Sequence, residues 1–179
     1  MRYMKASPVR TLGLLTLCFD AEHAEDPFEN DCNTALKMLY GREPLCKMIG
    51  EKAKAVLVFP KIVKAGFIFG RQFGQGVLLA NGKRVAHYNS AAGSIGLHAG
   101  VRLFGCALFL MNDHALQCLN KSDGWEIGAG PSTVVVNKDI AKSLTATALK
   151  GDAYAFSFDR KGLRTGLGIQ GSRITRLEK

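Results

Sequence analysis

Hydrophobic residues change their spacing once along this chain. From residue 27 to 53 they recur at helical spacing, as at Leu36, Leu39 and Tyr40, and Pro44 suits the first turn of a second helix. Further along, apolar and polar residues alternate, or apolar residues form short runs bounded by glycine or proline, which is typical of β-strands. The pattern therefore predicts short N-terminal helices followed by a β-rich body.

Turn signals divide the β-rich body into strands. Pro60 is expected to end the first strand, because proline cannot donate to a sheet ladder, and Asn81-Gly82 is a strong hairpin signal. Residues 93–111 are expected to form two strands or one bent strand. The other predicted strands are Ala55–Phe59, Val63–Phe69, Gln75–Ala80, Arg84–Asn89, a strand that follows the turn at Gly124 and ends at Val136, a half-buried strand at Tyr154–Phe158, and a last strand at Gly166–Leu177.

Three further segments complete the predicted fold. Asn112 is expected to cap one helix that is inserted among the strands and ends near Leu119. Residues 138–147 have an ambiguous pattern, and Lys161-Gly162 is expected to form a hairpin turn. The predicted class is α+β, with a curved or closed, barrel-like antiparallel sheet, short N-terminal helices and one inserted helix.

The glycine spacing at Gly70, Gly74 and Gly76 is superficially that of a phosphate-binding loop. The Lys-Ser/Thr pair that follows the glycines in such a loop is missing, and no helix is expected to begin there. We therefore predict a hairpin turn at these glycines.

The chain has 179 residues and a formal net charge of +9. This length is most simply one domain, and residues 25–179 are assigned to it. The charge favours anionic partners, namely phospholipid surfaces, nucleic acid or acidic proteins, although a basic surface also serves solubility. Basic residues are concentrated from Arg160 to Lys179, and acidic residues from Asp20 to Asp31.

Residues 1–24 are predicted to be a signal or targeting segment. Three basic residues precede the short apolar run Thr11–Phe19, as in a signal peptide. Residues 15–18 resemble a bacterial lipoprotein box ending at Cys18, although Leu17 is larger than the residue that normally precedes a lipidated cysteine. Export would place the protein in the periplasm of the bacterial cell envelope, with a lipid anchor at Cys18 as an option. An N-terminus that is not translocated is the alternative.

The five cysteines show no C-x-x-C spacing, which argues against a zinc knuckle or a thioredoxin-type site. In an exported protein, a disulfide between Cys32 and Cys46 could join the two predicted helices. Cys106 lies in an apolar strand and Cys118 on the inserted helix, so both are expected to be small buried side chains.

Six segments in a fixed order carry a resemblance to a known family. They are AVLVFPKIVKAGFIFG at Ala55–Gly70, GQGVLL at Gly74–Leu79, GSIGLHAG at Gly93–Gly100, ALFLMND at Ala107–Asp113, GWEIGAGPSTVVV at Gly124–Val136 and YAFSFDRKGLRTGLGIQGSRITRL at Tyr154–Leu177. With these segments the chain resembles the SYLF domain family, and most closely its bacterial envelope members. The resemblance extends from about Ala35 to Leu177 and leaves residues 1–30 outside.

The resemblance implies lipid binding. Eukaryotic members of the family are membrane-surface modules that recognise phosphoinositides, and some bind actin filaments, but a bacterial cell offers neither partner. The property that transfers by similarity is non-enzymatic binding of anionic phospholipid at a membrane surface, without a cofactor. A structural or protein-interaction role in the bacterial envelope is the alternative.

Basic residues beside apolar ones supply a mechanism for such binding. Lys and Arg near an anionic membrane contribute roughly 1 kcal/mol each, and apolar side chains that enter the interface add burial energy. If the predicted hairpin tips share one face, they form a phosphate-contacting surface, with Lys61 and Arg164 as the preferred contacts. Phe67 and Phe69 belong either to that surface or to the core. The predicted lipid-binding residues are Lys61, Lys64, Arg71, Lys83, Arg84, Arg160, Lys161 and Arg164.

Other chemistry has weak support in the sequence. The four histidines show no paired ligand spacing and no serine lies in a nucleophile-elbow context, so we expect neither a catalytic residue nor a metal site. Nucleic acid is disfavoured as a partner, because the glycine-rich segments lack interleaved arginine and aromatic residues and because export would remove that partner.

Overall fold

The structure is a computed structural model. It describes residues 26–95, 100–121, 124–144, 149–159, 162–163 and 171–177. The predicted signal segment 1–24, with Cys18, lies outside the described residues.

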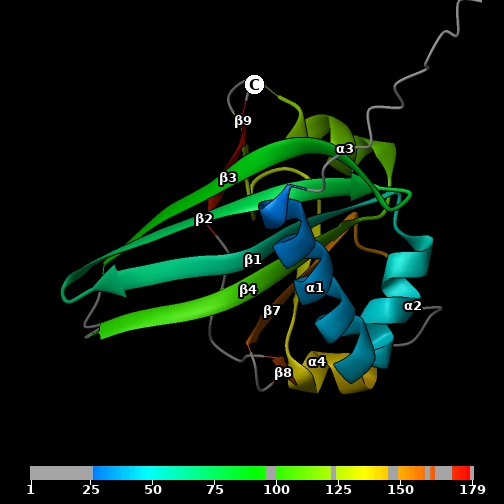
Figure 1. The fold of residues 1–179 in the computed structure, drawn as a ribbon, viewed down its shortest axis with the longest axis horizontal. Coiled ribbons are helices and arrows are strands. Elements are labelled where there is room, and N and C mark those ends of the chain that lie inside the picture. The colour runs from blue at the N-terminus through cyan, green and yellow to red at the C-terminus, as the bar shows by residue number, and fades with distance from the viewer. Residues whose placement is uncertain are drawn as a thin grey trace, which may run out of the picture.

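The described chain folds as α+β, with helices at its N-terminal end and a curled, mostly antiparallel sheet that forms a half-barrel (Figure 1). Eight strands follow one another in the order β5-β9-β3-β2-β1-β4-β7-β6, and β8 pairs with β7. The elements are α1 Pro27–Arg42, α2 Pro44–Lys52, β1 Ala55–Gly66, β2 Phe69–Ala80, β3 Lys83–Ile95, β4 Gly100–Leu110, α3 Asp113–Leu119, β5 Trp125–Glu126, β6 Thr133–Val136, α4 Lys138–Ser143, β7 Ala153–Asp159, β8 Gly162–Leu163 and β9 Arg173–Leu177.

The two predicted N-terminal helices are confirmed, and both begin with a proline in the first turn. The Asp26 side chain caps α1 by accepting a hydrogen bond from the Phe28 backbone N–H at 3.1 Å, which satisfies one of the free donors at a helix start. The buried face of α1 carries Cys32, Ala35 and Leu39. Apolar burial on this stripe holds the helix against the sheet.

Pro60 does not end a strand, in contrast to the prediction. β1 continues through it to Gly66, and the pairing with both neighbouring strands shifts register beside it, between Val58 and Lys61 on one side and between Phe59 and Ile62 on the other. A β-bulge tolerates proline because the bulged residue leaves the hydrogen-bonded ladder. The sheet can therefore run without a break into its outer half.

The predicted hairpin turn at Gly70, Gly74 and Gly76 is also wrong. These glycines lie inside β2, and the chain reverses at Phe67 and Ile68 instead. A Cβ atom on Gly76 would lie 2.6 Å from the Val58 carbonyl oxygen, so the neighbouring strand approaches too closely for any side chain there. The glycines serve close strand packing rather than chain reversal.

Local turn and cap signals were reliable. Asn81 and Gly82 have φ angles of 51° and 73°, as a two-residue hairpin turn between β2 and β3 requires. Asn112 caps α3 by accepting a hydrogen bond from the Ala115 N–H at 2.9 Å. The first part of segment 93–111 completes β3 and the later part forms β4, so the two-strand alternative holds for the described residues.

The C-terminal half differs from the prediction in three ways. β7 is buried on both faces rather than one, because it lies between β4 and β6 inside the sheet. The pair β6–β7 is parallel. The ambiguous segment 138–147 contains a second inserted helix, α4, which the side chain of Asn137 caps. Gly162 belongs to β8, and the remainder of the predicted turn at Lys161 lies outside the described residues.

Alternation along β1–β4 divides the apolar side chains between two cores. On the helix face, which α1 and α2 cover, Val58 and Val77 pack with Leu39 and Ile49. On the opposite, inner face, the core includes Leu57, Phe59, Leu78, Tyr88, Leu108, Leu119 of α3, Trp125 and Ile174. Since β1, β2 and β4 are buried on both faces beneath the helices, this half of the sheet forms the packed body of the molecule.

The cysteines on α1 and α2 do not form a disulfide: Cys32 and Cys46 are separate, buried free thiols. The Cys32 Sγ atom instead lies 3.7 Å from the Val58 carbonyl oxygen. Cys106 and Cys118 are buried as predicted. Among the described residues, no helix combines the length and the apolar character needed to cross a bilayer.

We predict that Leu57→Ala lowers the free energy of unfolding by about 2–5 kcal/mol, because it leaves a cavity in the core on the inner face of the sheet. Leu57 is fully buried, whereas Val85 is 54% exposed. Urea unfolding should therefore show a clear fall in midpoint for Leu57→Ala and a change of less than about 0.5 kcal/mol for the control Val85→Ala. Equal effects of the two substitutions would contradict this packing.

Candidate functional site

The outer ends of four strands project beyond the helices (Figure 1). We call this part the tongue and define it as residues 61–75 of β1 and β2, 88–95 of β3 and 100–104 of β4. The β1–β2 turn closes its end, and we call Phe67, Ile68 and Phe69 the tip. On the helix face, neither α1 nor α2 covers the tongue in the view of Figure 1.

Large hydrophobic side chains are exposed on the tongue and nearly nowhere else in the described chain. At the tip, the exposed fractions are 65% for Phe67, 51% for Ile68 and 73% for Phe69. Four more such residues of the tongue are Val63, Phe73, Val101 and Leu103, and outside it only Met38 and Val85 belong to this class. A contiguous exposed apolar patch of this kind marks an interaction surface.

Register places most of this patch on one face. Val63 pairs with Phe73 on one side and with Leu103 on the other, and directly paired residues of neighbouring strands point to the same face. By the alternation of β1 and β2, that face is the helix face, which carries Val58 and Val77 further inward. The apolar pattern that packs against α1 and α2 thus continues into the tongue, where neither helix covers it.

The two ends of β2 have turns of opposite chemistry. Asn81 and Gly82, at the end of β2 that lies away from the tip, are typical turn residues. Phe67 and Ile68, at the tip, are not. The outer turn depends on Gly66, where a Cβ atom would collide with the Phe69 carbonyl oxygen. An exposed turn made of large apolar residues breaks the usual rule for loops, which points to a functional role.

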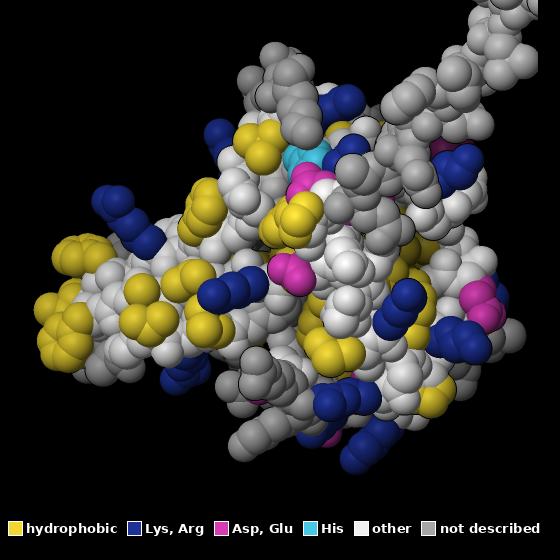
Figure 2. All heavy atoms as spheres, in the orientation of Figure 1, with side chains coloured by type: hydrophobic (Ala, Val, Ile, Leu, Met, Phe, Trp, Pro, Cys, Tyr) yellow, Lys and Arg dark blue, Asp and Glu magenta, His cyan; other side chains and the backbone are white. Residues whose placement is uncertain are grey.

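Charge on β1 to β4 is entirely of one sign. No Asp or Glu occurs from Lys52 to Asn112, and the same stretch holds eight basic residues: Lys52, Lys54, Lys61, Lys64, Arg71, Lys83, Arg84 and Arg102. Figure 2 shows hydrophobic side chains gathered on the projecting end, with Lys and Arg at their margins and no acidic side chain among them on this face. The tongue therefore presents apolar groups and positive charge together.

The structure brings three of the predicted lipid-binding residues to the tongue, namely Lys61, Lys64 and Arg71. Lys61 and Arg71 are exposed on the helix face, and Lys64 is partly buried on the inner face. Phe67 and Phe69, for which core and surface were both open, are surface residues. Arg160, Lys161 and Arg164 lie outside the described residues.

Lys83 and Arg84 do not join the tongue, contrary to the expectation of one shared face. They follow the Asn81-Gly82 turn, at the opposite end of β2 from the tip. Because β2 has 12 residues, they lie about 40 Å from the tip. Arg84 is also paired with carboxylates, at 3.7 Å from Asp26 and 3.5 Å from Glu29. Its charge helps to hold α1 on the sheet.

The sequence prediction missed Arg102, which lies on β4 directly opposite Lys64 of β1. It is exposed on the tongue. Its local sequence is an apolar run that gives no hint of a partner, because the pairing becomes visible only with the strand register. The signal that was available is the long stretch without Asp or Glu, in which Arg102 is the last basic residue.

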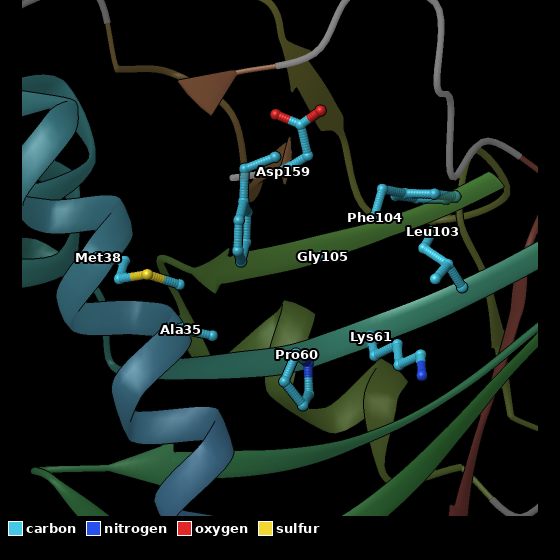
Figure 3. Close-up of a pocket in the computed structure, with 9 residues that line it drawn as sticks. Ala35, Met38, Pro60, Lys61, Leu103, Phe104, Gly105 and Asp159 are labelled. Carbon is cyan, nitrogen blue, oxygen red and sulfur yellow. The ribbon is translucent and has the colours of Figure 1, made fainter. Parts of the chain in front are cut away.

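A hollow of about 510 Å³ adjoins the tongue on the helix face (Figure 3). Ala35 and Met38 of α1 form one side of it, and Leu103 of β4 forms part of the other. Lys61 and Asp159 are the ionisable residues of its lining. Because Leu103 belongs both to the hollow and to the exposed patch, the hollow extends the apolar surface toward the body.

Groups for other chemistry are sparse in the described part of the chain. No cluster of three His, Cys, Asp or Glu side chains there is suited to hold a metal ion. No protein-family model matches the chain, and no curated protein matches it either. Membership of the SYLF family and the function that the resemblance implies therefore stay predictions.

We predict that the thiols on α1 and α2 are inert in the native protein. Burial raises the pKa of Cys32 to about 12 and moves the pKa of Cys46 further upward. Both groups are thus protonated at pH 8, and only a thiolate attacks iodoacetamide. Peptide mass spectrometry after a short pulse should find them unmodified in native protein and modified in urea. Rapid native labelling of either cysteine would contradict this assignment.

Proposed function

We propose that this protein is a non-enzymatic, SYLF-like module that binds anionic phospholipid at a membrane surface. The observation that carries the proposal is the Phe67-Ile68-Phe69 tip, which is exposed at the end of a projecting sheet and flanked by unpaired basic residues. In the described chain, Lys64, Arg71 and Arg102 make no ion pair. Apolar and cationic groups at one end are the two signals that stable membrane binding needs.

The magnitudes favour combined action of these groups. Transfer of the three tip side chains out of water contributes roughly 3–6 kcal/mol, given their present exposure. Three basic residues near an anionic surface add about 1 kcal/mol each. Neither contribution alone reaches the approximately 8 kcal/mol of a micromolar affinity, whereas their sum approaches it. Binding should therefore respond to loss of either.

Distances along the strands agree with this arrangement. Lys64 precedes Phe67 by three residues and Arg71 follows Phe69 by two, which places both within about 10 Å of the tip. Apolar groups of a surface-bound protein enter the interface by roughly 5–10 Å. When the tip enters to that depth, these cations lie at the level of the phosphates. Lys61 is about 20 Å from the tip and lies beyond that level.

We predict that Lys64→Glu combined with Arg71→Glu lowers binding to phosphatidylglycerol vesicles at least about 30-fold, the equivalent of losing about 2 kcal/mol. Co-sedimentation at low salt measures this change. Binding of the unaltered protein should also weaken as salt rises, because screening shortens the reach of the charges.

A control for position is Lys83→Glu, which makes one of the two charge reversals at an exposed residue about 40 Å from the tip. It should leave vesicle binding within about twofold. Equal losses for the control and the double variant would mean that net charge matters and position does not. Binding of the unaltered protein that ignores lipid charge would remove the electrostatic mechanism.

We predict that a tryptophan placed at the tip enters the bilayer. Ile68 is half exposed in the turn, so Ile68→Trp is accommodated without disturbing the core, and the native Trp125 is buried in the body. With phosphatidylglycerol vesicles, the emission of the new tryptophan should shift to the blue, and brominated acyl chains should quench it. Tryptophan at Val85, on the body, should show neither effect. An unquenched tip would place the contact elsewhere.

A second function, binding another protein, is favoured by the outer edge of β4. Residues 105–110 pair with β7, but residues 100–104 pair only with β1 among the described strands. An open edge next to exposed apolar side chains can accept a further strand. In that case the variant Lys64→Glu with Arg71→Glu would bind vesicles as the unaltered protein does. Light scattering would then show a stable complex between this protein and the protein that adds the strand. Location in the bacterial envelope remains part of the proposal.

A further inference from the structure

Two basic residues face each other on the inner face of the tongue. Lys64 of β1 and Arg102 of β4 are directly paired on neighbouring antiparallel strands, so their Cβ atoms lie about 5 Å apart and their side chains share a face. This is the face opposite to the one that carries Val63 and Leu103. The pair is therefore separate from most of the apolar patch.

Like charges opposite each other destabilise a sheet unless an anion lies between them. The described chain supplies no such anion: neither Lys64 nor Arg102 makes an ion pair, and no Asp or Glu occurs in the tongue. Arg84, by contrast, has two carboxylates within 4 Å. Carboxylates at the start of α1 thus neutralise Arg84 where it serves packing, whereas Lys64 and Arg102 have no such partner in the described chain.

A polar side chain borders the pair. Gln72 of β2 is directly paired with Lys64 on its other side, and it is only 5% exposed. Its Nε2 donates a hydrogen bond to the Ser172 hydroxyl at 3.2 Å, which fixes the amide in place. The row Gln72, Lys64 and Arg102 therefore crosses three strands, with a fixed amide at one end and an exposed guanidinium at the other.

We propose that Lys64 and Arg102 form a site for the phosphomonoester of a lipid headgroup, as found in phosphatidic acid. Two adjacent positive charges match a monoester, which carries about −1.5 to −2 at pH 7, better than a diester, which has only one ionisable oxygen. The arginine fork can donate two parallel hydrogen bonds to phosphate oxygens, and the lysine acts as a mobile point charge beside it. The site selects among anionic lipids by headgroup charge.

This inference rests on the proposed membrane binding and adds selectivity to it. Lys64 is about 10 Å from the tip along β1, and Arg102 lies beside it. When the tip enters the interface, the pair reaches the depth of the phosphates. A lipid in the outer leaflet can then be held by its headgroup while the tip lies among the acyl chains.

The test compares two vesicle compositions of equal total lipid charge, one with phosphatidic acid and one with phosphatidylglycerol. The unaltered protein should bind the phosphatidic acid vesicles at least fivefold more tightly. Lys64→Gln with Arg102→Gln should reduce that ratio to about one. The control, Lys61→Gln with Arg71→Gln, removes the same two charges from the helix face of the same sheet. It should weaken binding to both vesicles and retain the ratio.

Three outcomes would overturn the inference alone, and a fourth, no binding to either vesicle, would mean failure of the proposed function. Equal binding of the unaltered protein to both vesicles removes the selectivity but keeps membrane binding, whereas no binding to either removes membrane binding itself. A control that loses the ratio as fully as the Lys64 and Arg102 variant shows that position is irrelevant. If soluble glycerol 3-phosphate, without vesicles, binds as tightly as the lipid, the ligand is a free phosphate ester.

Folding of the variants is checked by their melting temperatures. Removing both charges of a repelling pair should leave the melting temperature of the Lys64 and Arg102 variant unchanged or raise it. A fall of more than a few degrees would show that the pair stabilises the sheet, and it would then count against an open anion site. The single variant Arg102→Gln, at an exposed position, provides the same ratio measurement with the smallest structural change.

Discussion

The arrangement of this molecule depends on a difference in length between its strands and the helices that cover them. β1, β2 and β3 contain 12 or 13 residues each, or about 40 Å of strand. On the helix face, α1 and α2 pack over the inner half, where Val58 and Val77 are buried. The same alternation of apolar side chains continues into the tongue, which neither α1 nor α2 covers in the view of Figure 1. The strands that form the body thus extend into the tongue, where their apolar side chains on the helix face are exposed.

Electrostatics distinguish the two ends of the same strands. At the inner end, the Arg84 guanidinium lies near the carboxylates of Asp26 and Glu29, and the Phe28 and His87 rings stack with their centroids 6.2 Å apart. These contacts fix the start of α1 on β3. At the outer end, the basic residues have no acidic neighbour within the tongue. A cation that is paired contributes to packing, whereas an unpaired cation beside apolar groups remains available to an external anion.

Sequence reasoning was accurate where one local interaction decides the structure. The Asn81-Gly82 turn and the Asn112 cap are examples, since each depends on residues within three positions. It failed at Pro60 and at Gly70–Gly76, where proline and glycine occupy a bulge and closely packed strand positions that only the neighbouring strands explain. Exposure of Phe67 and Phe69 was undecidable from spacing alone, because the pattern of a strand does not show whether a helix covers it. Arg102 could not be recognised as a candidate site residue from the sequence, because only the strand register places it opposite Lys64.

If the protein binds a membrane as proposed, the distribution of cations over both faces favours one direction of approach. If the protein lay flat on its helix face, Val63 and Phe73 would contact the lipid, but Lys64 and Arg102 would point away from the anionic surface. If the tongue enters by its tip, Arg71 on the helix face and the Lys64–Arg102 pair on the inner face both meet phosphates, because all lie within about 10 Å of the tip. Among the described residues, entry by the tip brings Lys64, Arg71 and Arg102 to the phosphates together, and the proposed lipid site on the inner face requires such entry.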